Sequence, residues 1–331
     1  MKKNKSHALA LAIERSMVDL TSACLFLNAS PIPGWMSSDI SRLDCIQGNK
    51  PEYNMLISSG YSAAARLDDE KKYSQGMLLI GKNRKQNQAW IKAVWDRLAD
   101  GGTLVVAGNK TDGIAAIRKW IAPFCNELES FSKFHAVVFS IKKSKDIQLP
   151  STSIERNVEG FFVSDGMFSS AHPDPGSMLL AEHFSSRIKG RVCDLGAGWG
   201  FLSNKLLNAS DEVTGLDLFE ADIMSLDAAK KNVPQSESIQ LSFNWIDVRK
   251  EFPKKPYDWV IMNPPFHSGR AAEPEIGKNF IEVAASTLPS GGRLLMVANK
   301  NLPYELTIKK LFRTFEPLEV KDGFKVLQCL K

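Results

Sequence analysis

The chain has 331 residues, 44% hydrophobic and 24% charged, which is ordinary for a folded globular protein and excludes a disordered or collagen-like chain. Its five cysteines are scattered, with neither a Cys-x-x-Cys pair nor metal-ligand spacing, so we expect reduced thiols, a cytoplasmic location and no metal. No apolar run approaches the ~20 residues of a membrane span. The apolar stretch Ala8–Ile13 is ended by Glu14 and Arg15, so we expect neither a signal sequence nor a membrane partner.

The excess positive charge is confined to the first half of the chain. Residues 1–150 contain 21 basic and 14 acidic residues, a net charge of +7, whereas residues 151–331 contain 21 and 23, a net charge of −2. A chain of this length is expected to form two domains, and the polar, breaker-rich segment 142–153 places their boundary between residues 150 and 151. A basic domain attracts polyanions by releasing counterions, so residues 1–150 are a candidate nucleic-acid surface. A merely soluble basic domain is the alternative.

Strands and helices alternate in the first half, which predicts an α/β domain with a parallel sheet. The predicted strands are Ala23–Leu27, Met55–Ser58, Met77–Ile80, Thr103–Ala107 and Ala136–Ile141. The predicted helices are Ala8–Met17, Gln88–Leu98 and Gly113–Ile121.

The second half repeats this alternation. It begins with Asp174-Pro175, a helix N-cap residue followed by proline at the first helical position. The predicted helices are Gly176–Arg187, Phe201–Asn208, Glu220–Asn232, Ile276–Leu288 and Tyr304–Phe315. The predicted strands are Arg191–Leu195, Glu212–Leu216, Ile239–Ile246, Tyr257–Met262 and Gly292–Ala298, followed by two more.

An internal repeat indicates that the two halves are duplicated. Leu98–Lys110 matches Leu288–Lys300 at an offset of 190 positions, with six of thirteen residues identical. The same offset superposes Phe134–Val138 on Phe324–Gln328. The first copy has no counterpart of the glycine-rich and Asn-Pro-Pro motifs of the second, so we expect it to keep the fold without the chemistry.

A glycine-rich turn follows the first strand of the second half. In VCDLGAGWG (Val192–Gly200), an apolar strand leads into Gly196, Gly198 and Gly200 and then into a helix. Glycine is needed where φ is positive or where a ligand lies against the backbone, so this turn is a candidate nucleotide-binding loop. We expect Asp194 to accept N–H groups of the loop or to reach the amino group of the ligand, and the cysteine beside it to be a core residue.

Two aspartates follow the next two predicted strands. Asp217, after the second strand, can accept hydrogen bonds from both ribose hydroxyls of an adenosine ligand, or else serves as a helix cap. Asp247, after the third strand, can accept from the adenine amino group, or else is a solvated turn residue. The carboxyl ends of parallel strands meet at one edge, so both belong to the same candidate site as the glycine turn.

The fourth strand ends in Asn263-Pro264-Pro265-Phe266. The prolines fix this tip, and the Asn263 amide oxygen with a neighbouring carbonyl can accept both hydrogens of an exocyclic amine. Phe266 can stack on the ring that carries the amine. The alternative is an ordinary Pro-Pro loop with a buried phenylalanine. His267 is a possible base, but a surface histidine is favoured, since the amine can lose its proton to solvent.

The order of these motifs resembles that of class I S-adenosylmethionine-dependent methyltransferases that act on amino groups. The duplication, the segment from Gly166 to Ser177 and the Gly323-Phe324-Lys325-Val326 ending make the chain similar to the bacterial ribosomal RNA guanine-N2 methyltransferases. The nearest resemblance is to the enzymes that act on small-subunit (16S) rRNA. It covers residues 160–330 by motif and the first half mainly by layout.

The resemblance implies two tandem Rossmann-like domains of the class I methyltransferase fold. The degenerate first domain, residues 1–150, would aid folding and RNA docking, and residues 151–331 would be catalytic. S-adenosylmethionine would bind at Asp194–Gly200, Asp217 and Asp247, with Trp199 on its methionine side, and the guanine amine at Asn263–Phe266. Lys325 would meet RNA phosphate, or else is a plain exposed lysine. The implied partner is ribosomal RNA or a ribosomal subunit, bound by a monomer.

Several alternatives stay open at this point. The same motifs suit a large-subunit guanine-N2, an adenine-N6 or a protein glutamine methyltransferase. A non-catalytic RNA-binding assembly factor on the same fold is a further alternative, which the intact motifs disfavour. A Rossmann dehydrogenase is disfavoured because its Gly-x-Gly-x-x-Gly spacing is absent.

Overall fold

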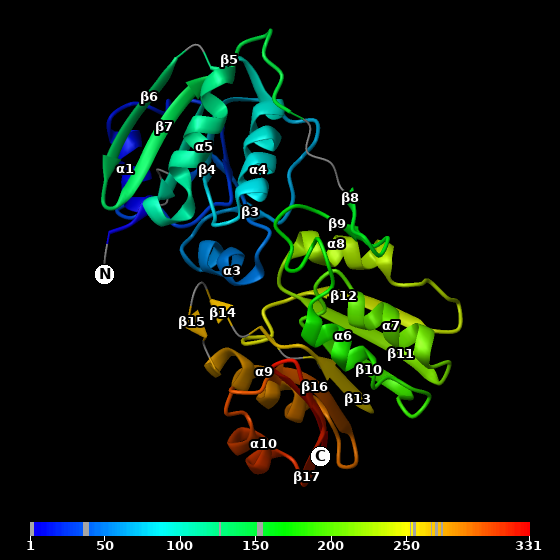
Figure 1. Ribbon diagram of the computed structural model, residues 1–331. Helices are drawn as coiled ribbons and strands as arrows, with labels where there is room; N and C mark the ends of the chain where they lie inside the picture. Colours follow the sequence, from blue (N-terminus) through cyan, green and yellow to red (C-terminus); the bar gives the residue numbers. More distant parts are fainter. Residues whose placement is uncertain are drawn as a thin grey trace. The chain divides into compact units, whose positions relative to one another are not determined.

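The computed structural model describes residues 3–35, 40–125, 127–150, 155–251, 253, 256–265, 267–268, 271–272 and 274–331. The chain divides into two compact units, Met1–Ile154 and Glu155–Lys331 (Figure 1). This boundary lies four residues after the one that the sequence predicts.

Unit 1 is an α/β domain built on a seven-stranded sheet with the order β3-β2-β1-β4-β5-β7-β6. All neighbours are parallel except β7, which is antiparallel to β5 and β6. The strands are β1 (Cys24–Leu27), β2 (Leu43–Ile46), β3 (Ala63–Ala64), β4 (Tyr73–Leu79), β5 (Leu98–Asn109), β6 (Leu128–Lys133) and β7 (Ala136–Lys142). The α-helices are α1 (Lys5–Glu14), α3 (Lys50–Ser58), α4 (Arg84–Arg97) and α5 (Ile114–Ile121).

Alternate residues of these strands face two separate cores, which makes unit 1 a three-layer domain. Phe26 and Met77 pack with Leu9 of α1 on one face of the sheet. On the other face, Leu78 packs with residues of α4 and α5 such as Val94, two helices that lie side by side in Figure 1.

Unit 2 repeats this architecture, with the sheet order β12-β11-β10-β13-β16-β18-β17 and β18 antiparallel to both neighbours. The strands are β10 (Gly190–Leu195), β11 (Val213–Glu220), β12 (Gln240–Trp245), β13 (Trp259–Met262), β16 (Arg293–Asn299), β17 (Thr314–Lys321) and β18 (Phe324–Leu330). The helices are α6 (Pro175–Ala181), α7 (Phe201–Ala209), α8 (Ile223–Asn232), α9 (Pro274–Thr287) and α10 (Glu305–Leu311). Two short hairpins complete the unit: β8 (Glu155–Arg156) with β9 (Phe162–Val163), and β14 (His267–Ser268) with β15 (Ala271–Ala272).

Helices cover both faces of the second sheet as well. Val192 and Ile261 pack with residues of α6, α7 and α8, such as Leu206. Cys193 faces the core on the opposite side of the sheet, where it packs with Ile281 of α9 and Ile308 of α10. This thiol is therefore a core residue, as expected. The predicted pair of Rossmann-like domains is confirmed, because both sheets have the same strand order.

The duplication holds, with one correction to the register of its second match. Ala107 pairs with Val138 in unit 1, and Val297, 190 positions after Ala107, pairs with Val326 in unit 2. Val138 and Val326 are therefore equivalent, an offset of 188 rather than 190. The two copies differ by two residues between these strands, which residue identities alone do not reveal.

Several predicted elements are wrong in detail. The helix predicted over Gly176–Arg187 ends at Ala181. Met55–Ser58 is the end of helix α3 rather than a strand, because a proline at its first turn starts a helix there. The predicted helix Tyr304–Phe315 ends at Leu311, and β17 begins at Thr314. The second strand of unit 2 continues to Glu220 instead of stopping at Leu216.

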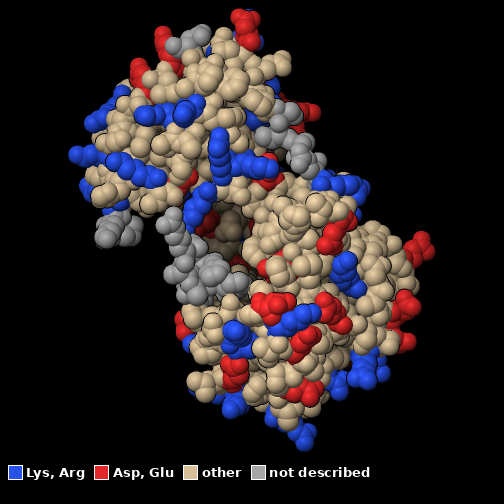
Figure 2. All heavy atoms as spheres, in the orientation of Figure 1, with Lys and Arg blue, Asp and Glu red and all other residues tan. Residues whose placement is uncertain are grey.

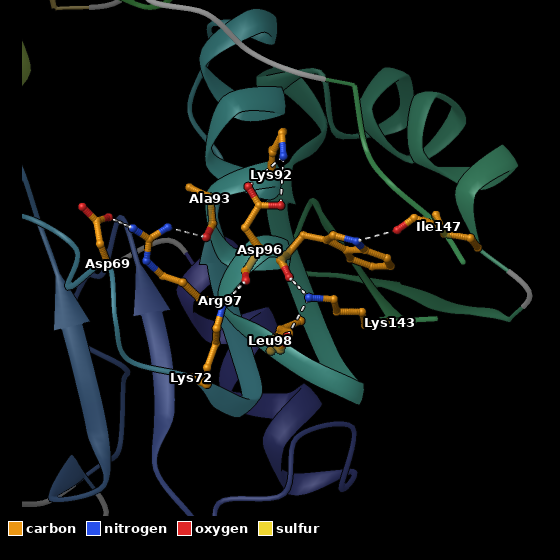
Figure 3. A network of polar contacts seen from close by, with 10 residues as sticks. Asp69, Lys72, Lys92, Ala93, Asp96, Arg97, Leu98, Lys143 and Ile147 are labelled. Carbon is orange, nitrogen blue, oxygen red and sulfur yellow. Dashed lines mark hydrogen bonds and ion pairs between the residues drawn. The ribbon is translucent and has the colours of Figure 1, made fainter. Parts of the chain in front are cut away.

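The units differ in surface charge, as the sequence predicts. On the face drawn in Figure 2, Lys and Arg side chains spread over unit 1, whereas both signs of charge are interspersed on unit 2. Three basic side chains of unit 1 hydrogen-bond to the end of one of its helices. Lys72, Arg97 and Lys143 donate to carbonyl groups at the C-terminal end of α4 (Figure 3), where a helix leaves its acceptors unpaired.

Candidate active site

The four parallel strands β12, β11, β10 and β13 bring their carboxyl ends to one edge of the second sheet. The chain order reverses between β10 and β13, which makes this a topological switch point, where open α/β sheets bind ligands. The glycine turn follows β10, and Asn263 follows β13. The predicted convergence of the motifs is therefore present.

The three glycines of the turn all have positive φ, with values of 75° at Gly196, 54° at Gly198 and 85° at Gly200. A Cβ on Gly196 would lie 3.2 Å from Phe280, and one on Gly200 would lie 3.0 Å from Val233. A Cβ on Gly198 would have no neighbour within 4 Å. Gly196 and Gly200 thus allow close packing of the turn, whereas the backbone at Gly198 is open to a ligand.

Asp194 at the end of β10 is completely buried. Its Oδ2 accepts a 2.7 Å hydrogen bond from the Ser203 hydroxyl, and its Oδ1 finds no partner in the described part of the chain. Burial raises the pKa of this carboxyl to about 7. The expectation that Asp194 holds the loop is wrong, since the N–H groups of Gly196 and Ala197 donate to the Phe219 carbonyl. A buried acceptor without a partner is instead suited to a ligand that brings a donor.

Glu220 is the acidic residue at the end of the second strand, and sequence reasoning missed it. Its Oε2 accepts from the Gly198 N–H at 2.8 Å, and its Oε1 accepts from the N–H groups of Ala221 and Asp222 at 2.8 Å each. Burial raises the pKa of this carboxyl. The sequence signal for Glu220 is the apolar pair Leu218 and Phe219, because these residues extend the strand beyond its predicted end at Leu216.

Asp217 lies inside β11, three residues before the strand end, so its expected place beside the glycine turn is corrected. It is 1% exposed, and its Oδ2 accepts from the Tyr257 hydroxyl at 2.7 Å and pairs with Arg191 at 3.1 Å. Its Oδ1 accepts from the Ser242 hydroxyl. Asp217 therefore joins strands inside the sheet.

Asp247 follows β12 at the expected edge and is 2% exposed. Arg249 holds both of its oxygens, through Nε to Oδ1 at 2.8 Å and Nη2 to Oδ2 at 3.1 Å. Oδ1 also accepts the Arg249 backbone N–H at 3.1 Å, so the capacity for another donor is on Oδ2.

The Asn263 amide at the end of β13 is held by two residues of the α6 N-terminus. Its Nδ2 donates to Asp174 Oδ2 at 2.8 Å and to Ser177 Oγ at 2.8 Å. Pro265 lies near the glycine turn, since a Cβ on Gly196 would be 4.0 Å from its Cδ. The tip and the turn are thus neighbours, and the carbonyl oxygen of the amide faces away from its two partners.

Phe266 lies outside the described residues, as does the side chain of His267, so their expected roles stay predictions. Trp199 is buried among Phe161 and Phe201, and its Nε1 donates to the Phe168 carbonyl at 3.0 Å. Its ring therefore packs in an aromatic core cluster behind the turn.

Lys325 is not the exposed phosphate ligand that the resemblance implied. It is 6% exposed, and its Nζ donates to the Leu302 carbonyl at 2.7 Å and to Glu305 Oε1. A buried lysine whose ammonium has an ion-pair partner is a structural element of the β18 region.

Within the described ranges, no three His, Cys, Asp or Glu side chains gather as metal ligands. Of the helices that the structure describes, none is long and apolar enough to cross a membrane.

Comparison with known proteins assigns a family to the second unit. The methyltransferase small domain model matches residues 160–328. Ribosomal RNA small subunit methyltransferase C of Idiomarina loihiensis is 27% identical over 252 residues, covering 72% of this chain and 73% of that protein. The protein of the same name from Shewanella loihica is 29% identical, covering 79% of this chain and 78% of the relative.

A solved structure resembles the whole chain. The T. thermophilus 16S rRNA N2 G1207 methyltransferase (RsmC), in complex with AdoMet and guanosine, is 26% identical with a TM-score of 0.79. The match covers 95% of this chain and 89% of that protein, so it includes both units.

Proposed function

Because the chain belongs to the methyltransferase small domain family, we propose that it transfers a methyl group from S-adenosylmethionine to the N2 amine of a guanine in small-subunit ribosomal RNA. The relatives named for small-subunit rRNA and the likeness to a guanine-N2 enzyme over both units support this substrate. The observation that carries the proposal is the Asn263 amide, fixed beside a glycine turn with its oxygen as the available acceptor.

The residues of the edge fit S-adenosylmethionine. The partnerless Oδ1 of Asp194 suits the ammonium of the methionine part, and the open backbone at Gly198 allows the ligand to approach the turn. Gly196 and Gly200 shape that turn. Glu220, rather than Asp217, would accept the ribose hydroxyls, because it lies at the strand end and bonds the Gly198 N–H.

The adenine end of the ligand would meet Asp247. Its Oδ2 accepts one hydrogen bond from Arg249 and retains a lone pair for the adenine amino group. When bound, the cofactor supplies a methyl group on a sulfonium, which is a reactive electrophile.

The chain supplies orientation and polarisation at the acceptor amine. Asn263 Oδ1 and the Pro264 carbonyl would accept the two hydrogens of guanine N2, which directs the nitrogen lone pair toward the methyl group. A methyl–sulfur bond is exchanged for a methyl–nitrogen bond, and the nitrogen then releases a proton to solvent. Pro265 stiffens the tip, and Phe266 would stack on the base.

Unit 1 would dock the RNA. Its net charge of +7 and the Lys and Arg side chains spread over it favour binding to phosphate groups. The proposal includes a monomer that acts on the small subunit in the cytoplasm.

The test is transfer of labelled methyl from S-adenosylmethionine to purified small subunits, large subunits and naked rRNA. The Asn263→Ala variant is assayed alongside. It should lose about 100-fold in turnover while its cofactor affinity is kept, because its side chain bonds Asp174 and Ser177 and none of the residues assigned to the cofactor. The RNA is then digested to nucleosides to locate the label.

Label in N2-methylguanosine from small subunits or their rRNA is the expected result. Label in N6-methyladenosine would indicate an adenine-N6 methyltransferase, label in large subunits alone a large-subunit enzyme, and label in protein a protein methyltransferase. Bound cofactor without transfer to any of these would leave an RNA-binding assembly role, and an unchanged turnover of Asn263→Ala would refute the assignment of the amine site.

A further inference from the structure

Three polar side chains from two segments of unit 2 that are distant in sequence meet at the amine site. Asn263 follows β13, while Asp174 is the N-cap residue of α6 and Ser177 lies in its first turn. Asn263 Nδ2 contacts Asp174 Oδ2 and Ser177 Oγ at 2.8 Å each, and Asp174 Oδ2 also accepts the Ser177 N–H at 2.9 Å. The three groups form a closed network, although Asp174 and Asn263 are 89 positions apart in sequence.

The backbone around this network is packed too tightly to shift. A Cβ on Gly176 would lie 2.9 Å from the Phe324 ring and 3.0 Å from Asp174 Oδ2. Ser177 is 9% exposed, and Leu180 in the next turn is completely buried in the core beneath the sheet. The start of α6 is therefore a fixed support for the strand end.

The network determines which way the Asn263 amide points. A side-chain amide has two orientations, one presenting oxygen and the other presenting NH₂. A carboxylate only accepts hydrogen bonds, so the Nδ2 group must face Asp174 and the oxygen must face the opposite side. In the reversed orientation Oδ1 would meet the carboxylate, and the hydrogen bond to Asp174 would be lost, whereas the Ser177 hydroxyl can pair with either end of the amide.

The orientation matters for the choice of acceptor group. An amide oxygen accepts hydrogens from an exocyclic amine but repels a base carbonyl, whereas an amide NH₂ does the reverse. The hydrogen bond to a carboxylate also polarises the amide, which makes its oxygen a stronger acceptor.

We infer that Asp174 and Ser177 are positioning residues that fix the Asn263 amide with its oxygen toward the acceptor, and thereby restrict methyl transfer to amines. This inference rests on the proposed function for its reaction, and it adds two residues that do not touch the reacting atoms.

The decisive test exchanges the two partners across the contact. Asp174→Asn keeps an N-cap residue of equal quality, but its NH₂ can donate to Asn263 Oδ1 and so permits the reversed amide. We expect kcat to fall about 10- to 100-fold, with KM for S-adenosylmethionine within about twofold. Asn263→Asp alone puts two carboxylates in contact, which cannot both be ionised, and should be at least as impaired.

The double variant Asp174→Asn/Asn263→Asp restores a donor opposite an acceptor. An oxygen of the new carboxylate then faces the amine, so we expect kcat to recover about tenfold or more over Asn263→Asp. A double variant no better than Asn263→Asp, or a wild-type kcat in Asp174→Asn, would overturn the inference. Ser177→Ala should lower kcat less than Asp174→Asn, because it removes only one neutral partner of the amide.

Asp222→Asn provides a matched control for stability. Asp222 caps α8 with the same Asp-x-x-Ser spacing, and its oxygens accept from Met224 and Ser225 of its own helix. Its change in melting temperature measures what the Asp-to-Asn exchange costs at a cap. A much larger loss in Asp174→Asn would mean that unfolding, rather than the amide, lowers kcat, and would contradict the inference.

A second readout separates this inference from the proposed function. In protein labelled with ¹⁵N-asparagine, the Nδ2 signal of Asn263 is identified by its absence in Asn263→Asp. It should shift on Asp174→Asn and Ser177→Ala, and unchanged signals would refute the contact even if rRNA is methylated. Shifted signals without methylation of any rRNA would instead refute the proposed substrate and retain the contact.

Discussion

Replacing Glu220 with glutamine should weaken S-adenosylmethionine binding much more than replacing Asp217 with asparagine. Glu220 Oε2 accepts the Gly198 N–H at 2.8 Å, and Oε1 accepts from the N–H groups of Ala221 and Asp222. If the oxygen of a glutamine kept the two bonds of Oε1, its NH₂ group would face the Gly198 N–H, and that hydrogen bond would be lost. A hydrogen bond to a charged group contributes about 1.5–3 kcal/mol. Since 1.4 kcal/mol corresponds to tenfold in Kd, the variant should bind about 10- to 100-fold more weakly.

Asp217→Asn should act on stability instead. The carboxylate accepts from the Tyr257 and Ser242 hydroxyls and pairs with Arg191, all inside the sheet. Loss of its charge and one acceptor should cost about 2 kcal/mol, or about 4–8 °C in the melting temperature of a unit this size. Its Kd for the cofactor should stay within about threefold, because no part of its role reaches the edge.

Isothermal titration calorimetry with S-adenosylmethionine and thermal unfolding of both variants measure the two quantities. The reasoning fails if Asp217→Asn loses more than about tenfold in affinity while Glu220→Gln binds like the wild type. That result would return the ribose contact to Asp217 and require β11 to end earlier than Glu220.

Three further predictions concern single positions. Burial raises the pKa of Asp194 from its ordinary 3.8 to about 7, so between these pH values the native state holds a proton that the unfolded state has released. The contribution of this group to the free energy of unfolding is therefore complete below about pH 4. It falls by at most about 4 kcal/mol as the pH rises through 7. Urea unfolding at about pH 5 and about pH 8 should show this fall, and Asp194→Asn should flatten it, whereas an equal fall in the variant would contradict the burial argument. Gly200→Ala should lower the melting temperature more than Gly198→Ala, because its methyl group would lie 3.0 Å from Val233. Gly198→Ala should mainly weaken cofactor binding. Equal decreases in melting temperature would count against the open backbone at Gly198. Lys325→Met should lower the melting temperature and leave KM for the ribosomal subunit unchanged, and the opposite pattern in unfolding and methylation assays would restore a role in RNA binding.

Local sequence patterns were sufficient for the parts of the site that lie on one short segment. The turn from Gly196 to Gly200 and the Asn263 tip each follow an apolar strand directly, so strand periodicity and residue type locate them. The fold followed for the same reason, because alternating strands and helices leave few parallel-sheet arrangements.

Other features depend on contacts that sequence spacing does not encode. Lys325 interrupts an apolar strand and so resembles a surface residue, but Glu305, twenty positions away, allows it to be buried. The contact of Asp174 with Asn263 joins segments 89 positions apart, and a good helix cap explains the aspartate without it. The prediction for Asp217 is wrong because an acidic residue in an apolar stretch need not end the strand, and Leu218 and Phe219 continue it to Glu220.

Side-chain hydrogen bonds occupy the edge of the first sheet that corresponds to the glycine turn of the second. Asn28 directly follows β1, as Gly196 follows β10, and both have positive φ, 49° and 75°. The Asn28 side chain donates to the Leu79 carbonyl at 2.6 Å and accepts from Gln47 at 3.2 Å. In unit 1 the Asn28 side chain therefore connects the end of β1 to the ends of β4 and β2. It does so at the position where unit 2 has Gly196. The two turns share a residue of positive φ at this position, and in unit 1 the side chain of that residue connects the neighbouring strand ends.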